Sequence, residues 1–479
     1  EKCAGRFPAH GALLADEFIS PAGIPDALAA VATKHLSGQL HPPVAALLER
    51  RPPAMSMQMA GELAIDAAIR ITGSMAGDCL VIQGPPGTGK TFAASRVITA
   101  LLAKNKKIGI TSNSHKAVVN LIKACGEASG EVGASLLGIK VGGEVDSGVL
   151  AANPGVQFIA SSTDARGRYN GGVVGGTAWL FTRPEWEDVL DFLFIDEAGQ
   201  VPLANAVAMA RCAKNLVLLG DQMQLEQPIQ GSHPGDAGLS VLQYALKDTV
   251  ASLPDVPLFH AVVPSEYGLF LGESRRMHPS VCGFISESMY ESRLRSHPDC
   301  TRQKLIVPAG SNGLIVRESG IVFVRVEHDG NIQQSEEEVE QVKAIYNELS
   351  GRIYTDKDGS IRQLELKDFL FIAPYNAQVR ALHAALPPGA RVGSVDKFQG
   401  QEAPVCILSL CSSYGEYGSR GLTFILDRNR LNVAISRAQC LAIVVADQRI
   451  AGTLPSSLDE MMLINLLCKL AANSNQPTC

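Results

Sequence analysis

The sequence predicts an α/β protein made of two successive units, each built on a parallel β-sheet, with a cleft between them. Short uninterrupted apolar runs suit parallel strands that are covered on both faces, and the intervening segments are long enough for crossover helices. Ligands usually bind where two such units meet. The first set of runs comprises residues 78–83, 107–111, 157–161, 191–195 and 215–219, and the second comprises 321–326, 368–373, 405–410 and 441–446.

We expect three divisions along the 479 residues. Residues 1–55 are rich in Pro, Ala and Leu without a strong period, which indicates short helices and connectors. Residues 56–258 should form the first α/β unit, with a Gly- and Ser-rich loop or small insertion at about 126–156, and residues 272–479 should form the second. The chain begins with Glu1 rather than Met, so we expect a fragment or processed product of a longer protein.

The second unit contains one clear helical signal between its first two strands. Ser335 and Glu338 have the spacing of a capping box at a helix start. The residues that follow repeat apolar side chains at helical spacing and predict one buried face. This face consists of Val339, Val342, Ile345, Tyr346 and Leu349.

Composition excludes several classes of protein. The chain is 46% apolar and 19% charged, which is ordinary for a packed soluble protein, and no apolar run approaches the roughly 18 residues of a membrane span. Eleven scattered cysteines without a C-x-x-C pair indicate reduced thiols and a cytoplasmic location. A net charge of −6 argues against a generally basic protein that coats nucleic acid.

Positive charge is nevertheless concentrated in one stretch, from Thr91 to Gly126, which has no acidic residue. Such a strip can bind phosphates on an acidic protein, and a solvated lysine face on a surface helix is an equally good interpretation. The basic residues are Arg96, Lys104, Lys106, Lys107, Lys116 and Lys123.

Residues 83–91, QGPPGTGKT, fit the phosphate-binding loop G-x-x-x-x-G-K-[ST], after an expected strand and before an expected helix. The glycines let backbone N–H groups face phosphates at the helix N-terminus. Lys90 would reach the β- and γ-phosphates, and the Thr91 hydroxyl would hold Mg²⁺. The loop that binds the nucleotide would comprise Gly84, Pro85, Pro86, Gly87, Thr88, Gly89, Lys90 and Thr91.

Two further strands end in polar groups that suit hydrolysis of a bound nucleotide. The run FLFIDEAGQ places Asp196 to hold the metal through water and Glu197 to activate an attacking water, a common division of roles. The run LVLLGDQMQLEQP places Gln224 beside them in such a sheet, where its amide could sense the γ-phosphate. Alone, this last signal is weak, since glutamines after turns are usually solvated.

Arg437, in LNVAISRA, lies inside an apolar stretch, although a buried charge is costly unless it is paired. The nearest acidic residues along the chain are Asp427 and Asp447. Its partner is therefore either a distant carboxylate or the γ-phosphate of a nucleotide held by Lys90.

Together with these elements, further motifs resemble superfamily 1 helicases of the B branch, the group of the nonsense-mediated-decay helicases and the replication nuclease-helicases. The resemblance runs in family order from residue 83 to 438. It implies two tandem RecA-like domains with an ATP cleft between them, ATP and Mg²⁺ as cofactors, and a single nucleic-acid strand as partner. The additional motifs are TSNSHKAVVNL (111–121), RRMHP (275–279), IAPYNAQV (372–379), VGSVDKFQGQEAPVCIL (392–408) and RLNVAISRA (430–438).

The resemblance also implies roles for individual residues. Gln224 would couple the state of ATP to nucleic acid, and Arg276 and Arg437 would contact the γ-phosphate from the second domain. Gly400 and Glu402 would lie near the phosphate or ribose of the nucleotide. The contacts with the strand would come from Ser114, His115, Lys116, Ser394 and Asp396.

The phrases SHKA, GGTAWLF, DEAGQ, QGSHP and APYNAQV are most similar to one subgroup, bacterial helicase modules fused behind a RecB-like nuclease. This resemblance favours DNA over RNA, movement from 5′ to 3′, a role in DNA repair, and a covalently linked or associated nuclease domain as a partner. The rival hypotheses are a nucleic-acid-stimulated ATPase clamp or remodeller that does not unwind, and a P-loop switch that binds only proteins.

Three other signals have plain structural interpretations. The run LELK (364–367) matches the E-x-K of such a nuclease but leads directly into an expected strand, so an edge strand is the better hypothesis. Trp179 could stack on a base, at about 1–3 kcal/mol, or lie in a core. His278 is expected to cap a helix or support the structure rather than act as a catalyst.

Overall fold

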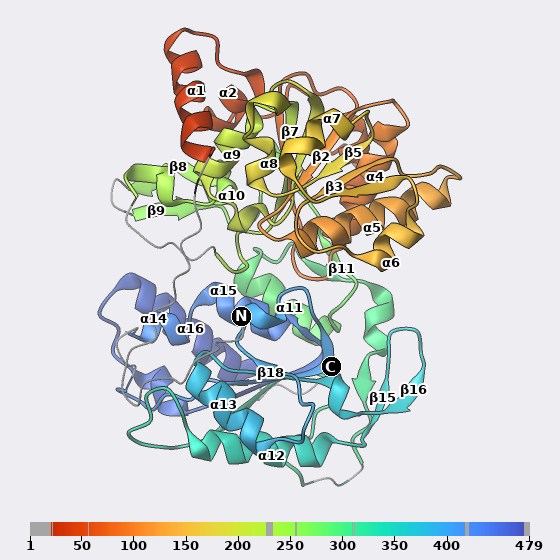
Figure 1. Cartoon of the computed structure of the whole chain (residues 1–479). Helices are drawn as coiled ribbons and strands as arrows, with labels where there is room; N and C mark the ends of the chain where they lie inside the picture. The colour runs from red at the N-terminus through yellow and green to blue at the C-terminus, as the bar shows by residue number, and fades with distance from the viewer. Residues whose placement is uncertain are drawn as a thin grey trace, which may run out of the picture.

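The computed structural model describes residues 21, 23–55, 57–226, 233–253, 256–308, 310, 312–416 and 421–473. The first twenty residues of the expected N-terminal segment, and most of the phrase QGSHP at 230–234, lie outside this part of the chain. Two parallel sheets, each flanked by helices, are stacked one above the other in Figure 1, as the predicted fold class requires.

The first sheet has eight strands, and every neighbouring pair is parallel. All five runs predicted for the first unit form strands in it. In spatial order the strands are β10 (Gly268–Phe270), β1 (Cys79–Gln83), β7 (Ala213–Gly220), β6 (Leu190–Ile195), β2 (Ile108–Thr111), β5 (Val173–Gly175), β3 (Gly138–Val141) and β4 (Val156–Ile159).

Helices cover both faces of this sheet, which is why its strands are apolar throughout. One face packs on α3 (Ala64–Thr72), α4 (Lys90–Leu102) and α5 (His115–Glu131), and the other on α8 (Ala178–Phe181) and α9 (Leu203–Ala210). Outside the sheet lie α6 (Ser147–Ala152), α7 (Ser162–Arg168), α10 (Val241–Ala245) and an antiparallel pair, β8 (Lys247–Leu253) and β9 (Val256–Phe259).

The expected loop or insertion at 126–156 is instead part of the sheet. The segment contains the end of α5, the strand β3 between β5 and β4, and the short helix α6. The strand is only four residues long and begins with a glycine, so it leaves a weak apolar signal. Its place between two parallel neighbours stabilises it, and a one-dimensional pattern does not show that contact.

The second sheet is also entirely parallel and contains all four predicted strands. Its order is β14 (Gly320–Arg325), β20 (Ala438–Ala446), β19 (Ala403–Ser409), β17 (Phe369–Ile372) and β18 (Val392–Gly393). The helices around it are α11 (Pro279–Met289), α12 (Glu336–Leu349), α13 (Asn376–Ala385), α14 (Gly421–Ile425), α15 (Arg428–Ser436) and α16 (Leu458–Asn473).

Small strands link the two units and border the second. A parallel pair, β11 (Glu273–Ser274) and β12 (Arg295–Ser296), follows the first sheet. A three-stranded antiparallel sheet is formed by β13 (Lys304–Leu305), β15 (Ile353–Thr355) and β16 (Ile361–Gln363). One apolar core cluster runs from the first sheet through α11 and α15 to the second, so the two units share packing as well as a cleft.

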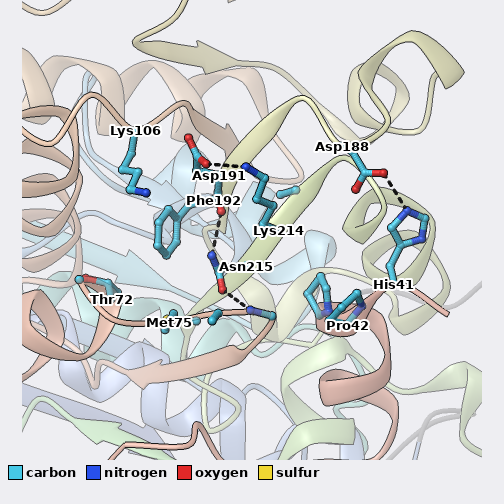
Figure 2. Close-up of a pocket in the computed structure, with 15 residues that line it drawn as sticks. His41, Pro42, Thr72, Met75, Lys106, Asp188, Asp191, Phe192, Lys214 and Asn215 are labelled. Atoms are coloured by element: carbon cyan, nitrogen blue, oxygen red, sulfur yellow. Dashed lines mark hydrogen bonds and ion pairs between the residues drawn. The ribbon is translucent and has the colours of Figure 1, made fainter. Parts of the chain in front are cut away.

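The N-terminal helices α1 (Ile24–Leu36) and α2 (Pro42–Leu48) pack on the first unit, as expected for short helices and connectors. A cluster of ion pairs at the amino-terminal edge of the sheet holds them there, and Figure 2 shows its contact between His41 and Asp188. Lys34 and Arg211 both bind the Glu187 carboxylate, at 2.5 and 2.6 Å, and His41 Nε2 lies 3.4 Å from Asp188 Oδ2. Because two cations already neutralise Glu187, the cluster is a structural clamp and a poor metal site.

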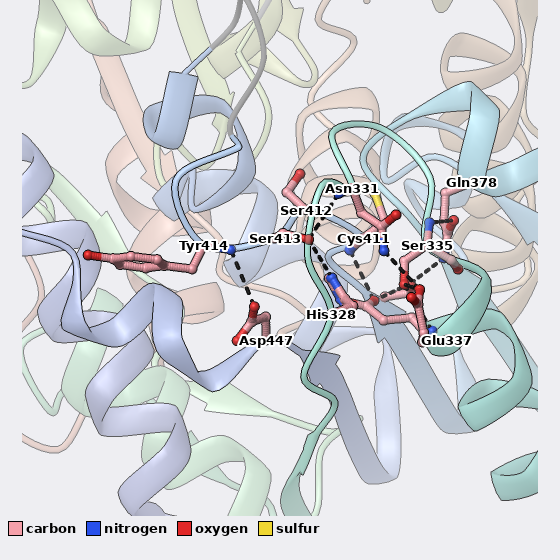
Figure 3. Close-up of polar contacts among 12 residues, drawn as sticks. His328, Asn331, Ser335, Glu337, Gln378, Cys411, Ser412, Ser413, Tyr414 and Asp447 are labelled. Atoms are coloured by element: carbon pink, nitrogen blue, oxygen red, sulfur yellow. Dashed lines mark hydrogen bonds and ion pairs between the residues drawn. The ribbon is translucent and has the colours of Figure 1, made fainter.

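The helix predicted after Ser335 forms as α12, and its apolar face is buried. Ser335 Oγ accepts the Glu338 backbone N–H at 3.1 Å, but the Glu338 side chain does not return to the cap. It is fully buried among hydrogen-bond donors from elsewhere in the unit. Two of these donor residues, His328 and Cys411, are labelled in Figure 3. His328 Nε2 lies 3.0 Å from Glu338 Oε1, and the Ser409 hydroxyl and the Cys411 N–H donate to Oε2.

Burial and hydrogen bonding have opposing effects on the pKa values of Glu338 and His328. Burial raises the pKa of Glu338, and its hydrogen-bond donors only partly offset that rise. For His328, burial alone would lower the pKa, but the hydrogen bond and charge of Glu338 raise it overall. The cluster ties the start of α12 to the end of β19, a connection that the capping-box pattern did not indicate.

No helix in the part of the chain that the structure describes is long and apolar enough to cross a membrane.

We predict that Glu338→Gln lowers the free energy of unfolding by about 1–3 kcal/mol, because the amide replaces one of the two acceptor oxygens with an N–H donor that faces a buried donor. The control is Glu340→Gln on the exposed side of the same helix, expected to change stability by less than about 0.5 kcal/mol. Denaturant unfolding at neutral pH measures both. Equal effects would show that the buried cluster does not hold the helix.

Candidate active site

The phosphate-binding loop connects β1 to α4, as the sequence predicted. Gly87 and Gly89 have φ values of 76° and 78°, a left-handed conformation that glycine adopts without strain. At Gly84 a Cβ atom would lie 2.0 Å from Lys90 Cγ, so the lysine folds back over the loop only because this residue is glycine.

Lys90 lies among carboxylates that follow β6 and β7. Its Nζ is 3.3 Å from Glu197 Oε2. Burial alone would lower the pKa of Lys90, but Glu197, Asp196 and Asp221 together raise it. The ammonium is therefore charged and turned toward the end of β6.

Asp196 and Glu197 have different surroundings. Asp196 is buried, and burial together with the Glu197 charge raises the pKa of its carboxyl. Asp196 Oδ1 accepts the Glu197 backbone N–H at 2.9 Å, while Glu197 itself has a φ of 52°, an unusual conformation for a residue with a side chain. That backbone turn directs the Glu197 side chain to Lys90.

A divalent ion would fit this donor set. Thr91 and Asp196 offer a hydroxyl and a buried carboxylate, the oxygen ligands that Mg²⁺ prefers. A dication would also relieve the repulsion between Asp196 and Glu197 that raises the pKa of Asp196. Their roles as metal ligands remain predictions.

Both arginines expected from the second domain line the same cavity as the phosphate-binding loop. The cavity has a volume of about 310 Å³. It therefore joins elements that are about 350 residues apart in the sequence. The lining consists of Pro85, Pro86, Gly87, Thr88, Gly89, Lys90, Thr91, Glu197, Gln224, Arg276, Gln399, Gly400 and Arg437.

Arg437 ends helix α15 and is 2% exposed. Its Nε donates to the Val433 carbonyl at 3.1 Å, and one terminal nitrogen donates to the Gln401 carbonyl at 3.2 Å. Within the described residues, no carboxylate oxygen lies within 4.0 Å of its guanidinium. Burial and the nearby Arg276 lower the pKa of Arg437 to about 9. The alternative of a buried ion pair therefore has no partner among these residues.

Arg276 is held differently. Its Nε donates to Glu402, and one terminal nitrogen donates to the Ser436 carbonyl at 3.3 Å. Gln439 binds the other oxygen of Glu402 at 2.9 Å. Glu402, expected near the nucleotide, thus orients Arg276, while Gly400 lines the cavity.

The segment before Arg276 rests directly on the phosphate-binding loop, a contact that the sequence did not reveal. Ser274 Oγ donates to the Pro86 carbonyl at 3.0 Å, and Arg275 N donates to the Gly87 carbonyl at 2.9 Å. A Cβ on Gly87 would lie 2.5 Å from Arg276 Cβ. Gly87 therefore permits both the turn and this close approach.

A buried polar network joins the two units beside the cavity. The Asp221 carboxylate accepts from Gln224 Nε2 at 2.8 Å, from the Tyr290 hydroxyl at 2.7 Å and from Gln83 Nε2 at 3.3 Å. Asn432, on α15, donates to the Tyr290 oxygen at 2.8 Å. Gln224 is thereby connected to the helix that ends in Arg437. Sequence reasoning missed Tyr290 and Asn432, although the buried Asn432 lies in the same apolar stretch as Arg437.

The residues predicted to contact a single nucleic-acid strand lie just beyond the carboxyl-terminal ends of β-strands. Ser114 and His115 follow β2, and Ser394 and Asp396 follow β18. Ser114 Oγ accepts the Ala117 N–H at 3.2 Å and so caps α5, which leaves its hydroxyl proton free to donate elsewhere. Asp396 lies 3.6 Å from Arg430, and Lys116 is exposed.

The basic residues between Thr91 and Gly126 do not form one strip. Lys104, Lys106 and Lys107 lie at the amino-terminal end of β2, and Lys116 and Lys123 lie on α5 beyond its other end. Two members are also paired with carboxylates: Arg96 with Glu131 at 2.6 Å and Lys123 with Glu127 at 4.0 Å. The role of Lys116 as a phosphate contact stays a prediction, and the ion pair of Lys123 favours the solvated-face interpretation for that residue.

The remaining sequence signals also have defined surroundings. His278 accepts the Ser280 N–H at 3.2 Å and caps α11, which confirms the structural interpretation. Trp179 follows β5 and is 38% exposed, so it is not a core residue. The expected edge strand at 364–367 is wrong. The edge strand β16 ends at Gln363, and Leu366–Asp368 form a short 3-10 helix, beside which Glu365 and Lys367 pair with each other at 2.7 Å.

The fold and the site define a class: P-loop nucleotide-binding proteins in which a second parallel-sheet unit supplies arginines to the phosphate cavity. Comparison with known proteins agrees. Two family models, each described as an AAA domain, match residues 66–249 and 255–449.

The chain is also similar in sequence to curated proteins. The chain is 27% identical over 406 residues to the DNA replication ATP-dependent helicase/nuclease DNA2 of Gallus gallus, covering 83% of this chain and 37% of that protein. It is 24% identical over 425 residues to the DNA polymerase alpha-associated DNA helicase A of Schizosaccharomyces pombe, covering 77% and 60%. The chain thus spans less than two thirds of the length of either relative. Over most of its length the chain is therefore similar to proteins that are named as DNA helicases.

Among solved structures, the chain is similar to an arterivirus nonstructural protein 10 (helicase) in complex with DNA. The TM-score is 0.41 at 15% identity, covering 80% of this chain and 64% of the other.

We predict that Tyr290→Phe destabilises the protein by about 1–3 kcal/mol, because it removes a donor from buried Asp221 and an acceptor from Asn432. Tyr414→Phe is the control, since that side chain is 47% exposed, and should change stability by less than about 0.5 kcal/mol. Thermal unfolding without nucleotide compares the two. If both unfold like the parent, the network does not hold the units together.

Proposed function

We propose that this chain is the motor of an ATP-dependent helicase that moves 5′ to 3′ along single-stranded DNA. The observation that carries the proposal is the shared cavity, where Lys90, Glu197 and Gln224 from the first unit meet Arg276 and Arg437 from the second. In such a site, ATP hydrolysis is fastest when the two units are close enough for both arginines to reach the phosphates. Hydrolysis is thereby coupled to the movement of one unit relative to the other.

The proposed chemistry uses the chain's own groups in sequence. Backbone N–H groups of the loop and Lys90 hold the β- and γ-phosphates. Glu197 accepts a proton from the attacking water. Arg276 and Arg437 stabilise the charge that develops on the transferred phosphoryl group. Mg²⁺, when held by Thr91 and Asp196, would neutralise phosphate oxygens.

The proposed coupling runs through Gln224. Its amide lines the cavity and also binds Asp221, which binds Tyr290 of the second unit. A change in the γ-phosphate would therefore shift the position of Tyr290 and Asn432, and with them α15. Alternating closure and opening would carry a strand past Ser114, His115 and Lys116 on one unit and Ser394 and Asp396 on the other.

The relatives support DNA as the nucleic acid that this chain binds, since both are named as DNA helicases or DNA replication helicases. One of them is also named as a nuclease. We propose accordingly that a nuclease domain, linked or associated, works with this motor. We also propose DNA repair as the pathway, from the resemblance of the motifs to the bacterial modules fused to a RecB-like nuclease.

The decisive experiment is strand displacement. With ATP, the protein should release a labelled strand from a duplex with a 5′ single-stranded overhang and leave one with a 3′ overhang intact. Lys90→Ala should bind the strand without displacing it. If single-stranded DNA stimulates ATP hydrolysis but no labelled strand is released, the protein is a clamp or remodeller. If added single strands do not change the ATPase rate, a protein-binding switch is favoured.

Arg437→Ala should lower the ATPase rate at least about a hundredfold, by analogy with the effect of arginine fingers. Stability without nucleotide should barely change, because the substitution removes a guanidinium that has no carboxylate partner among the described residues. An ion-paired arginine would instead cost about 3–5 kcal/mol. Arg183→Ala, which removes a surface arginine paired with Glu185, is the control for steady-state hydrolysis. A variant that melts early but hydrolyses ATP normally would exclude the finger role.

A further inference from the structure

Lys140, on β3, is a buried lysine without an acidic partner in the described part of the chain. It is 4% exposed, and within the described residues no carboxylate oxygen lies within 4.0 Å of its Nζ. Burying an ammonium is costly unless all of its protons are bound. Its three acceptors are the Val141 carbonyl, the Gly142 carbonyl and the Nδ1 atom of His115, at 3.2 Å.

This arrangement determines which nitrogen of His115 carries its proton. An ammonium donates three hydrogen bonds and accepts none. Two of the Lys140 protons have carbonyl acceptors, so the third is directed to Nδ1, which must then be unprotonated. The neutral ring therefore carries its proton on Nε2. Among the described residues, Nε2 has no hydrogen-bond partner, and the His115 side chain is partly exposed.

The turn after β3 fixes the plane of the ring. Gly142 and Gly143 have φ values of 70° and 69°. A Cβ on Gly143 would lie 2.6 Å from His115 Cγ, and one on Gly142 would lie 3.2 Å from Cε1. Only glycine allows both this backbone and this contact. The imidazole is therefore packed against the turn as well as bonded to the lysine.

We propose that Lys140 is a positioning residue that holds His115 as the neutral Nε2–H tautomer, so that His115 offers a fixed N–H donor to a phosphate oxygen of the single strand. This inference rests on the proposed function, in which His115 lies on the path of the strand. Its consequence is a strand contact that does not change with pH near neutrality.

The charged surroundings agree with this role. The pKa of His115 is lowered by burial and by Lys140, and burial lowers the pKa of Lys140 to about 8. Lys116 is next to His115 on α5, and Glu144 and Asp146 line the same small cavity as Lys140. Neither acid is close enough to pair with Lys140 or His115.

The first test needs no nucleic acid. Imidazole ¹H–¹⁵N correlation spectra of the whole chain, with His115→Gln to assign the signal, report the tautomer and the titration of the ring. We expect the Nε2–H form at about pH 7.5, persisting to about pH 6, below the ordinary histidine pKa. An Nδ1–H ring, or one that titrates normally in the parent protein, would overturn the inference without any Lys140 variant.

The second test is strand binding by Lys140→Met, with Lys343→Met, an exposed lysine on α12, as the control for lost charge. At about pH 7.5, Lys140→Met should bind single-stranded DNA about twofold to tenfold more weakly, the effect of one oriented hydrogen bond. Binding should become tighter toward about pH 6, where the released imidazole gains a proton. Adding His115→Gln should abolish that pH dependence.

Binding by Lys140→Met that matches the parent at both pH values would refute the role. A parent protein that shows the expected tautomer but binds no strand would instead refute the proposed function and leave the positioning of His115 intact.

Discussion

The relative placement of the two units depends on the need to satisfy one buried carboxylate. Asp221 is 2% exposed, and burial raises its pKa. It is surrounded by donors from β1, from its own turn and from the end of α11. An unsatisfied charge at this depth would cost several kcal/mol. The Tyr290 hydroxyl is therefore held at a set distance from the end of β7, and the helices of the second unit follow it.

The phosphate cavity combines groups that repel or compete with one another. Burial and the nearby charge of Arg276 both lower the pKa of Arg437. On the opposite side, Asp196 and Glu197 repel each other. A bound nucleotide and its metal ion would supply the missing opposite charges on both sides. This unbalanced electrostatic arrangement fits a site that is completed by its ligand.

Two lysines illustrate how surroundings separate chemical roles. Lys90 has three carboxylates nearby, so it stays charged in the cavity. Lys140 has two carbonyls and an imidazole, so its charge is weakly supported and is used to orient a neighbour. Glycines leave room for Lys90 and for the imidazole that Lys140 orients, Gly84 beside Lys90 and the Gly142–Gly143 turn beside His115.

The sequence by itself determined nine strands of the two sheets, the phosphate-binding loop and the carboxylates after β6, because each depends on neighbours along the chain. Apolar runs and glycine spacing are local signals. The prediction of a loop or insertion at 126–156 was wrong because β3, which lies there, has only a weak apolar pattern. Only the tertiary structure decided how distant side chains are satisfied. The Glu338 side chain pairs with His328 and does not complete the capping box. Arg276 pairs with Glu402, and the Arg437 guanidinium donates to carbonyl groups and not to a carboxylate. Burial creates these pairings, since a desolvated charge takes whichever partners folding brings within reach, and their distance along the chain leaves no pattern to read.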